Sequence, residues 1–430
     1  MERWAGGSLA NWFHRERVDR LGQPLLKSPV ASWIRDSLMA ANSIAISLDK
    51  ATFESWQTAF ENLLVPRVVS VIPVGDFEIA SELPTEVRFT GIRLLLQIGR
   101  ACSRPEIMED PSRLFALLKY ATALSPGTPV LSGGGIRDLS LAFEIETLDS
   151  HKKAVLSDEF GCGMAFEISG QALGTHFYLD VETALREKWI QTSSTRNQRP
   201  DYFALTLSGP VPWVVLEAKG SQSGNGYSSR RQIPKGCQQL SRVALVNTGA
   251  AEPIRVVVAT SLSRHGSRHP TRVFVGDPEP NFPEPYVFSK DAVETVVRSH
   301  YRRISVLTGD TRLANSLMGV KARPAGDEDS LILEKIGGRK FAGSRVTFNN
   351  AESSIESFVG LDISIREALL DGHFRPISEG LRTLALPNSQ DEGDTPDSAK
   401  AGLIAVEMEN DGSVLIVKRR WNAADQVKRK

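Results

Sequence analysis

Two neighbouring apolar segments constrain the fold of this chain most strongly, because each of them meets charged residues at one end. One segment follows Asp201, and the other, 213–216, runs directly into Glu217 and Lys219. Successive side chains of a strand point to opposite faces, so residues 217 and 219 should share a face. A Ser-Gly-Pro turn at 208–210 would fold the two strands together and bring Asp201 close to that pair. The sequence therefore predicts two carboxylates and one ammonium group at a single strand end.

This cluster has the chemistry that a divalent cation requires. Mg²⁺ prefers oxygen ligands and is commonly held by one or two carboxylates together with substrate phosphate. Asp201 and Glu217 can supply the carboxylates, and the backbone carbonyl of Ala218 can supply a third oxygen. Lys219 can hold an attacking water or neutralise charge that builds on a phosphate group. A bound metal would polarise the phosphoryl group and lower the pKa of water. We therefore expect a Mg²⁺ site, which Mn²⁺ could also occupy.

Pro200, Asp201, Glu217 and Lys219 together resemble the motif of the PD-(D/E)xK nuclease superfamily. Domains of this superfamily run in the order helix, strand, strand bearing Asp, strand bearing Glu-x-Lys, helix, strand. The resemblance implies an α/β fold with a restriction-endonuclease-like central mixed sheet flanked by helices. It also implies an endonuclease that hydrolyses phosphodiester bonds in DNA, with restriction or phage defence as the associated role.

Many members of the superfamily carry a further metal-binding glutamate on the helix before the Asp-bearing strand. The helical spacing of 178–190 predicts that helix here, and it offers two candidates. We assign the role to Glu182, and Glu187, about one turn further on, stays open as the second candidate. Asp158 and Glu159, in an acidic turn before a strand at 164–168, could approach the metal site. A structural role is expected for both of them and for Glu167 in that strand.

Other elements follow from apolar spacing and run length. The segment 235–246 is expected to be a helix, and the nearly continuous apolar run at 254–262 is typical of a buried strand. A further strand is expected at 272–275, and the apolar spacing of 289–307 predicts a helix that closes the nuclease-like domain.

Contact with a polyanion would need a local basic patch, because lysine plus arginine equals aspartate plus glutamate at 51 each. The Gly-, Ser- and Asn-rich segment after Lys219 predicts a mobile loop that carries Arg230, Arg231 and Lys235. We expect these three residues, with Gln239 at the start of the next helix, to contact the DNA backbone. The segment 263–272 holds three arginines and two histidines, and is either a phosphate-binding loop or a plain surface loop.

Two other functions compete with a nuclease. The motif residues can also form a turn cap and a solvated ion pair at a strand end. The alternative function is therefore a non-catalytic nucleic-acid- or protein-binding platform that keeps the nuclease fold. A second alternative is an interaction protein whose partner surface lies in the N-terminal region. A homo-oligomer or a regulatory protein partner is compatible with each of these functions.

The cysteines and the apolar runs of the sequence predict where in the cell the protein is located. The three cysteines are widely spaced and form neither a disulfide framework nor a zinc site, which favours a cytoplasmic protein. An apolar signal core at the N-terminus and a run of 18 apolar residues are both missing, so no membrane association is expected.

A chain of 430 residues is expected to form two or three domains. Residues 1–145 should be a mostly helical module, with helices at 49–64 and 110–121 around a strand at 68–74. Residues 146–310 should form the nuclease-like domain. Residues 311–430 should form a mixed α+β module with helices at 312–318 and 363–371, and a hairpin around the Asn-Asp-Gly turn at 410–412.

Overall fold

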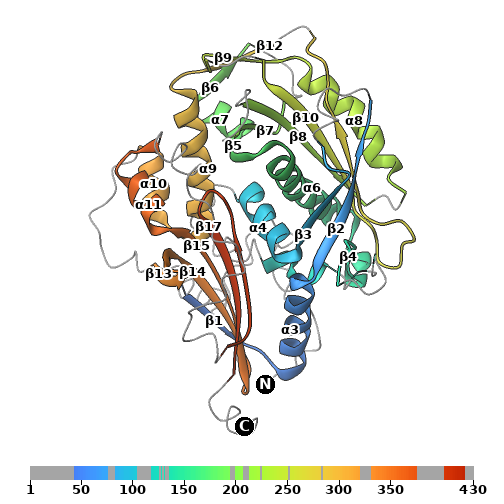
Figure 1. Ribbon diagram of the computed structural model, residues 1–430, viewed down its shortest axis with the longest axis vertical. Helices are drawn as coiled ribbons and strands as arrows, with labels where there is room; N and C mark the ends of the chain where they lie inside the picture. The colour runs from blue at the N-terminus through green and yellow to red at the C-terminus, as the bar shows by residue number, and fades with distance from the viewer. Residues whose placement is uncertain are drawn as a thin grey trace, which may run out of the picture.

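The computed structural model describes residues 43–75, 83–103, 118–124, 127, 130, 135–193, 199–206, 213–222, 225–249, 252–281, 284–319, 331–374 and 401–421. In these residues the chain is an α/β protein, with mixed sheets covered by helices, as expected (Figure 1). No helix in the described part of the chain combines the length and the apolar character needed to cross a membrane.

The larger sheet has eight strands, in the order β3-β2-β11-β10-β8-β7-β5, with β4 paired to β2. Strands β5, β7 and β8 are antiparallel in turn, and β10 runs parallel to β8. On the other side, β11 is antiparallel to β10 and parallel to β2. The strands are β2 (Pro66–Pro73), β3 (Glu86–Thr90), β4 (Arg137–Asp138), β5 (Thr175–Asp180), β7 (Tyr202–Thr206), β8 (Trp213–Ser221), β10 (Ile254–Ser261) and β11 (Arg272–Gly276).

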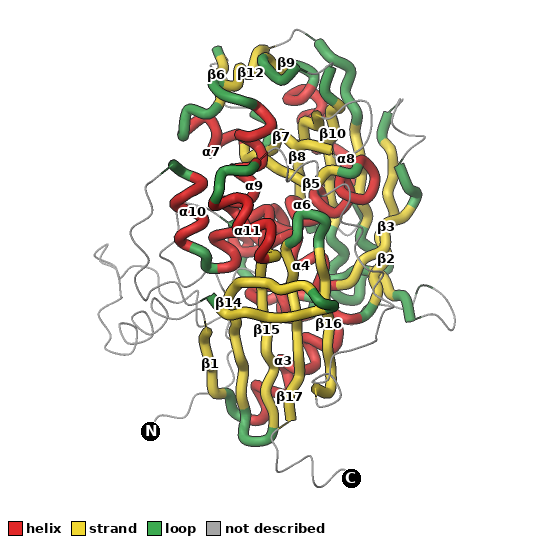
Figure 2. The backbone as a smooth tube through the Cα atoms, turned by 60° about the vertical axis from the view of Figure 1, so that its left-hand side comes forward, coloured by secondary structure: helices red, strands yellow, loops and turns green. Residues whose placement is uncertain are grey.

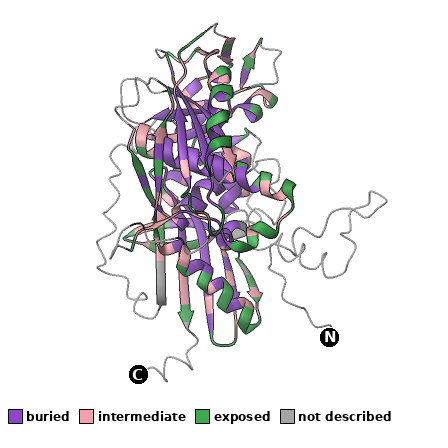
Figure 3. Cartoon of the chain, turned by 90° about the vertical axis from the view of Figure 1, so that its right-hand side faces the viewer, coloured by how far each residue is buried: buried purple, intermediate pink, exposed green. Residues whose placement is uncertain are grey.

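Helices bury both faces of this sheet. Along β8, Val214 and Leu216 pack into a core with α4 (Gly91–Cys102) and α6 (Ser150–Leu173). Trp213 and Val215 alternate with them and face a second core, which contains residues of α7 (Val181–Arg186), α8 (Tyr227–Leu240) and α9 (Ala292–Thr308). Figure 3 shows the buried positions concentrated in these layers.

The second sheet has six strands, in the order β1-β14-β15-β17-β16, with β13 also paired to β14 (Figure 2). One face is covered by α3 (Lys50–Leu64), whose Trp56 stacks on Phe348 with ring centroids 4.7 Å apart. The strands are β1 (Ser43–Ser47), β13 (Ile332–Ile336), β14 (Arg339–Asn349), β15 (Ser353–Asp362), β16 (Ala401–Met408) and β17 (Ser413–Trp421).

The remaining described elements lie between and beside these sheets. A three-stranded sheet has the order β6-β12-β9. These elements are η3 (Leu118–Ala123), η4 (Phe143–Thr147), β6 (Ile190–Thr192), β9 (Val243–Val246), β12 (Glu284–Phe288), α10 (Thr311–Leu317) and α11 (Ile363–Leu370).

The sheets do not follow the boundaries expected at residues 145 and 310. Strands β2 and β3 come from the N-terminal segment, yet they extend the sheet that contains β5 to β11. Strand β1 pairs in parallel with β14 near the other end of the chain. The division into three folding modules stays a prediction.

Several elements predicted from local pattern are confirmed. Helix α3 begins after Asp49, whose side chain accepts a hydrogen bond from the N–H of Thr52, and it buries the expected apolar stripe. Strands β2, β10 and β11, helices α9, α10 and α11, and the β16–β17 hairpin also lie where they were expected. The predicted turn at 208–210 and most of the predicted helix at 110–121 lie outside the described residues.

Four other predictions are wrong. The strand expected at 164–168 is the interior of α6, because an apolar run that is buried against neighbours has no periodicity to separate helix from strand. The helix expected at 178–190 begins as strand β5, and only Val181–Arg186 is helical. The mobile loop expected after Lys219 becomes α8 from Tyr227 onward, and the helix expected at 235–246 ends at Leu240 before β9. Packing decides this last case, because Ile233 and Leu240 of α8 are buried against the sheet.

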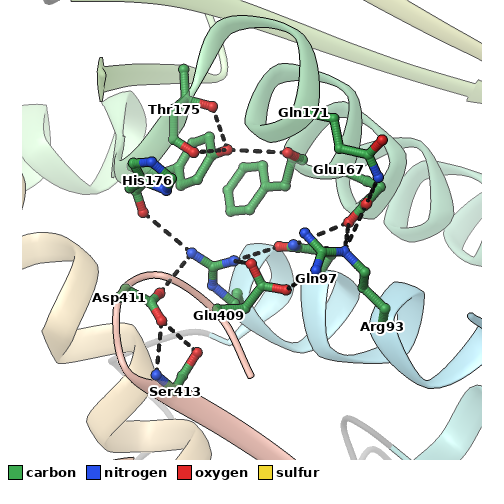
Figure 4. Close-up of polar contacts among 12 residues, drawn as sticks. Arg93, Gln97, Glu167, Gln171, Thr175, His176, Glu409, Asp411 and Ser413 are labelled. Carbon is green, nitrogen blue, oxygen red and sulfur yellow. Dashed lines mark hydrogen bonds and ion pairs between the residues drawn. The ribbon is translucent and has the colours of Figure 1, made fainter. Parts of the chain in front are cut away.

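A buried polar network joins the turn of the C-terminal hairpin to the large sheet (Figure 4). Arg100 of α4 pairs with Asp411 at 2.6 Å and donates to the backbone carbonyl of His176 on β5 at 3.2 Å. Asp411 also lies 2.7 Å from Nε2 of His300 on α9, and it accepts a hydrogen bond from the N–H of Ser413. The turn at the tip of the hairpin therefore contacts two helices of the larger core, α4 and α9, and is linked to β5 through Arg100.

Candidate active site at the end of strand β8

The structure brings Asp201, Glu217 and Lys219 together. In the antiparallel pairing of β7 with β8, Tyr202 lies opposite Leu216, so Asp201 falls opposite Glu217 at the next position. Oδ2 of Asp201 accepts a hydrogen bond of 2.8 Å from the N–H of Ala218. Oε1 of Glu217 is paired with the ammonium group of Lys219. The predicted cluster therefore exists as a geometric unit.

Glu217 is the most constrained member of this cluster. Its side chain is 0% exposed, and its Oε2 atom is buried without a hydrogen-bond partner. Burial raises the pKa of Glu217 to about 8, and the charge of Asp201 adds to this rise while Lys219 opposes it. Burial also raises the pKa of Asp201. Two neighbouring carboxylates with raised pKa values can share a proton or a cation.

Lys219 carries its charge in this setting. Burial lowers the pKa of Lys219, but the negative charges of Glu217 and Asp201 outweigh that effect and raise it overall. Lys219 therefore keeps its positive charge at neutral pH beside the two carboxyl groups.

Helices on both faces of β8 hold the site in place through close backbone approaches. A Cβ atom at Gly236 of α8 would lie 3.4 Å from Cγ of Glu217. On the opposite face, a Cβ atom at Gly161 of α6 would lie 2.9 Å from the carbonyl oxygen of Lys219. A Cβ atom at Gly220 would overlap the carbonyl oxygen of Ser157, so only glycine permits this approach.

The structure does not join Glu182 to the cluster. Its side chain on α7 is 71% exposed and pairs with Nη1 of Arg199 at 2.8 Å. In the described part of the chain, no hydrogen bond or ion pair connects it to Asp201 or Glu217. Glu187 instead lies 3.7 Å from Nη1 of Arg302.

The sequence allowed Asp158 to approach the metal site, although a structural role was expected for it. It lies on α6 close enough to Lys219 for that charge to lower its pKa, although partial burial raises the pKa overall. The available signal was the long helix that starts after the cap residue Asp149 and ends at Gly174, where φ is +64°. A helix through 150–173 turns Asp158 toward the end of β8.

The basic residues predicted to contact DNA lie on a helix. Arg230, Arg231 and Lys235 belong to α8, and the guanidinium group of Arg231 lies 5.0 Å from the ring centroid of Tyr227. The side-chain amide of Gln239 is engaged within the protein, because its Nε2 donates to the backbone carbonyl of Arg199 at 3.1 Å. Gln239 thereby ties the end of α8 to the segment that carries Asp201.

The donor atoms of the cluster fit Mg²⁺ better than a metal that needs a full set of protein ligands. Among the residues that the structure describes, no group of three or more His, Cys, Asp or Glu side chains is arranged to hold a metal ion. Mg²⁺ needs fewer protein ligands, because it retains several waters and is satisfied by one or two carboxylates. The unpartnered Oε2 of Glu217 is an oxygen available for such an ion.

Comparison of the chain with protein-family models, with curated proteins and with solved structures finds no match.

Proposed function

We propose that this protein is a Mg²⁺-dependent nuclease that hydrolyses phosphodiester bonds in DNA. The observation that carries the proposal is Glu217, a fully buried carboxylate with one unpartnered oxygen beside the carboxylate of Asp201. Burying a charged oxygen without a donor costs free energy, and a cation shared by both carboxylates removes that cost. Mn²⁺ would serve the same oxygen ligands.

The arrangement of the elements supports the same proposal. The chain runs α6, β5, α7, β6, β7, β8, α8, β9, β10. When α7 and the two strands of the three-stranded sheet, β6 and β9, are left out, the order is α6, β5, β7, β8, α8, β10, with the acidic residues at the start of β7 and on β8. This is the order helix, strand, strand, strand, helix, strand that the resemblance to the PD-(D/E)xK superfamily implies. A role in restriction or phage defence rests on that resemblance alone.

Each residue then has a distinct part. Asp201 and Glu217 would hold the metal ion, and the N–H of Ala218 fixes the orientation of the Asp201 carboxylate. When bound, the ion would polarise the phosphoryl group and lower the pKa of water. Lys219, already held by Glu217, would orient the attacking water or neutralise charge on the phosphate. Asp158 lies on α6, on the opposite face of β8 from Glu217, and would act only through its charge on Lys219.

Incubation of the purified protein with linear, circular and single-stranded DNA tests this function. We expect cleavage with Mg²⁺ or Mn²⁺ and none with EDTA. Asp201→Asn, Glu217→Gln and Lys219→Met should each lower the cleavage rate by about 100-fold or more, because each removes charge from the transition-state environment. Glu182→Gln, which alters an exposed carboxylate outside the cluster, is the matched control and should stay within about twofold of the wild type. Thermal melts of every variant verify folding.

Persistence of metal-dependent cleavage in the three folded site variants would contradict the assignment of the site. A folded protein that cleaves none of the three DNAs with either metal would contradict the nuclease function itself.

One observation favours a non-catalytic binding platform as the second candidate. The ion pair between Lys219 and Glu217 partly balances the buried charge without any metal. In that case the protein would bind DNA or a protein in EDTA, cleave nothing, and melt at the same temperature with and without Mg²⁺.

A further inference from the structure

The loop between β10 and β11 leaves the sheet at the same edge as the candidate site. Ser221 and Ser261 are partners in the parallel pairing of β8 with β10, and Lys219 is two positions before Ser221. The N–H of Leu262 then donates to the carbonyl oxygen of Ser221 at 2.8 Å. The loop therefore starts next to the end of the strand that carries Glu217 and Lys219.

Specific contacts fix the base of this loop. The N–H of Ser263 donates to Oγ1 of Thr271 at 2.9 Å, and Oγ1 of Thr271 donates to the carbonyl oxygen of Leu139 at 2.6 Å. Both residues are buried. Nε of Arg264 donates to the carbonyl oxygen of Gln222 at 2.9 Å, which ties the loop to the segment after β8. These hydrogen bonds fix the base of the loop, and the base determines where the tip of the loop lies.

The loop carries positive charge with no compensating carboxylate. Arg264 and Arg268 are exposed, and Arg272 is half-buried at the start of β11. In the described part of the chain, none of these three arginines forms an ion pair. The segment 263–272 contains no Asp or Glu, although the whole chain has a net charge of zero. Glu144 and Glu146 of η4 lie next to Phe143, which contacts His265, and they limit the basic surface on that side.

The start of α8 lies at the same sheet edge. Oγ of Ser229 lies 2.6 Å from Oγ of Ser221 and donates to the carbonyl oxygen of Thr260 at 3.0 Å. Arg230 and Arg231 follow directly on this helix. Basic residues of α8 and of the loop between β10 and β11 therefore both lie near the ends of β8 and β10.

We propose that the loop residues Arg264, Arg268 and Arg272 bind the phosphodiester backbone of DNA beside the candidate site. The inference rests on the proposed function, because it names the surface that would hold the substrate there. Arginine guanidinium groups match the geometry of phosphate oxygens, and a fixed loop base reduces the entropy lost on binding. Such contacts supply affinity without reading the base sequence.

Binding measured without cleavage tests this surface. Fluorescence anisotropy in EDTA would follow labelled double-stranded DNA and labelled single-stranded DNA of equal length, from about 50 to 200 mM salt. The triple variant Arg264→Ala, Arg268→Ala, Arg272→Ala should bind at least about tenfold more weakly at the lowest salt. On double-stranded DNA, its log–log salt slope should fall by about 0.9 for each phosphate that the variant no longer neutralises. The strandedness of the preferred DNA shows which form the surface accepts.

A triple variant with the same change in charge elsewhere is the matched control. Lys50, Lys335 and Lys340 are exposed on other elements, and their replacement by Ala should leave affinity and slope within about twofold. Arg268→Glu, at the exposed tip, repeats the test without disturbing the anchored Arg264. Thermal melts verify that each variant is folded.

The failures of the two proposals are distinguishable. Unchanged affinity and slope in the folded triple variant and in Arg268→Glu would overturn the loop surface and leave Mg²⁺-dependent cleavage standing. DNA binding that depends on the loop, in a protein that never cleaves, would overturn the nuclease and retain the surface. A wild-type protein that binds neither DNA at the lowest salt would overturn the loop proposal.

Discussion

Glu217 and Asp411 are equally buried carboxyl groups, but neighbouring charges shift their pKa values in opposite directions. Burial alone raises the pKa of a carboxyl group, and it does so at both Glu217 and Asp411. At Glu217 the adjacent carboxylate of Asp201 raises the pKa further. At Asp411 the charge of Arg100 and the hydrogen bond with His300 outweigh burial and hold the pKa well below its usual range. Asp411 is therefore satisfied by the protein, whereas Glu217 is not.

His176 provides a pH test at the same scale. Burial lowers its pKa to about 4, against an ordinary value of 6.5. The unfolded chain therefore takes up this proton first as the pH falls, so stability is complete above pH 6.5 and declines toward pH 4. Between pH 6.5 and pH 4, the free energy of unfolding of His176→Gln should fall less steeply than that of the wild type. The two slopes should differ by about 1.4 kcal/mol per pH unit. Urea denaturation at several pH values measures it.

His151 is the control for this prediction, because it is exposed at the start of α6. His151→Gln makes the same substitution at an exposed position and is measured alongside. Equal slopes for the wild type and His176→Gln would show that His176 keeps an ordinary pKa in the folded protein.

At the scale of elements, the contact between α6 and β8 determines where the site lies. Gly161 and Gly220 allow the backbones of helix and strand to touch, and this contact sets Asp158 on α6 beside Lys219 on β8. A side chain at either position would separate the two elements.

Gly220→Ala should therefore destabilise the protein by about 3 kcal/mol, because its Cβ would overlap the carbonyl oxygen of Ser157. Gly135→Ala is the control, since no atom lies within 4 Å of a Cβ at that position. Urea denaturation of both variants measures the difference. A cost at Gly220 no larger than the cost at Gly135 would mean that α6 and β8 lie further apart than described.

For the whole molecule, the hairpin turn that bears Asp411 links the two sheets. Arg100, His300 and Asp411 come from α4, α9 and the turn between β16 and β17, and all three are buried. Strand β1 adds a second link, because it pairs with β14 while the chain after it enters α3 and the large sheet. The two sheets should therefore unfold together.

Asp411→Asn tests this link, because it removes the nearer of the two carboxylates, those of Asp411 and Glu409, that pair with the buried guanidinium group of Arg100. The free energy of unfolding should fall by about 3–5 kcal/mol. Replacing Arg88, which pairs with Glu86 on the exposed surface, by Gln should cost less than about 1 kcal/mol. Thermal and urea denaturation compare the two variants. If Asp411→Asn lowers the free energy of unfolding as little as the Arg88 variant does, the network does not hold the sheets together.

Local patterns in the sequence determined the parts of the fold that depend on near neighbours. Capped amphipathic helices such as α3 and α9 were predictable, as were short apolar strands and the hairpin around Asn-Asp-Gly. The meeting of Asp201 with Glu217 and Lys219 was also predictable, because it needs only two successive strands in antiparallel register. The pairing of adjacent strands is a short-range property of the chain.

Only the tertiary structure decided the features that join distant segments. Asp158 reached the site because α6 packs on β8, and α8 formed in a Gly- and Ser-rich segment because Ile233 and Leu240 are buried against the sheet. The pairing of β1 with β14, and the burial of Asp411 against Arg100, depend on residues hundreds of positions apart. Such contacts result from the packing of complete elements, and no local pattern of the sequence specifies them.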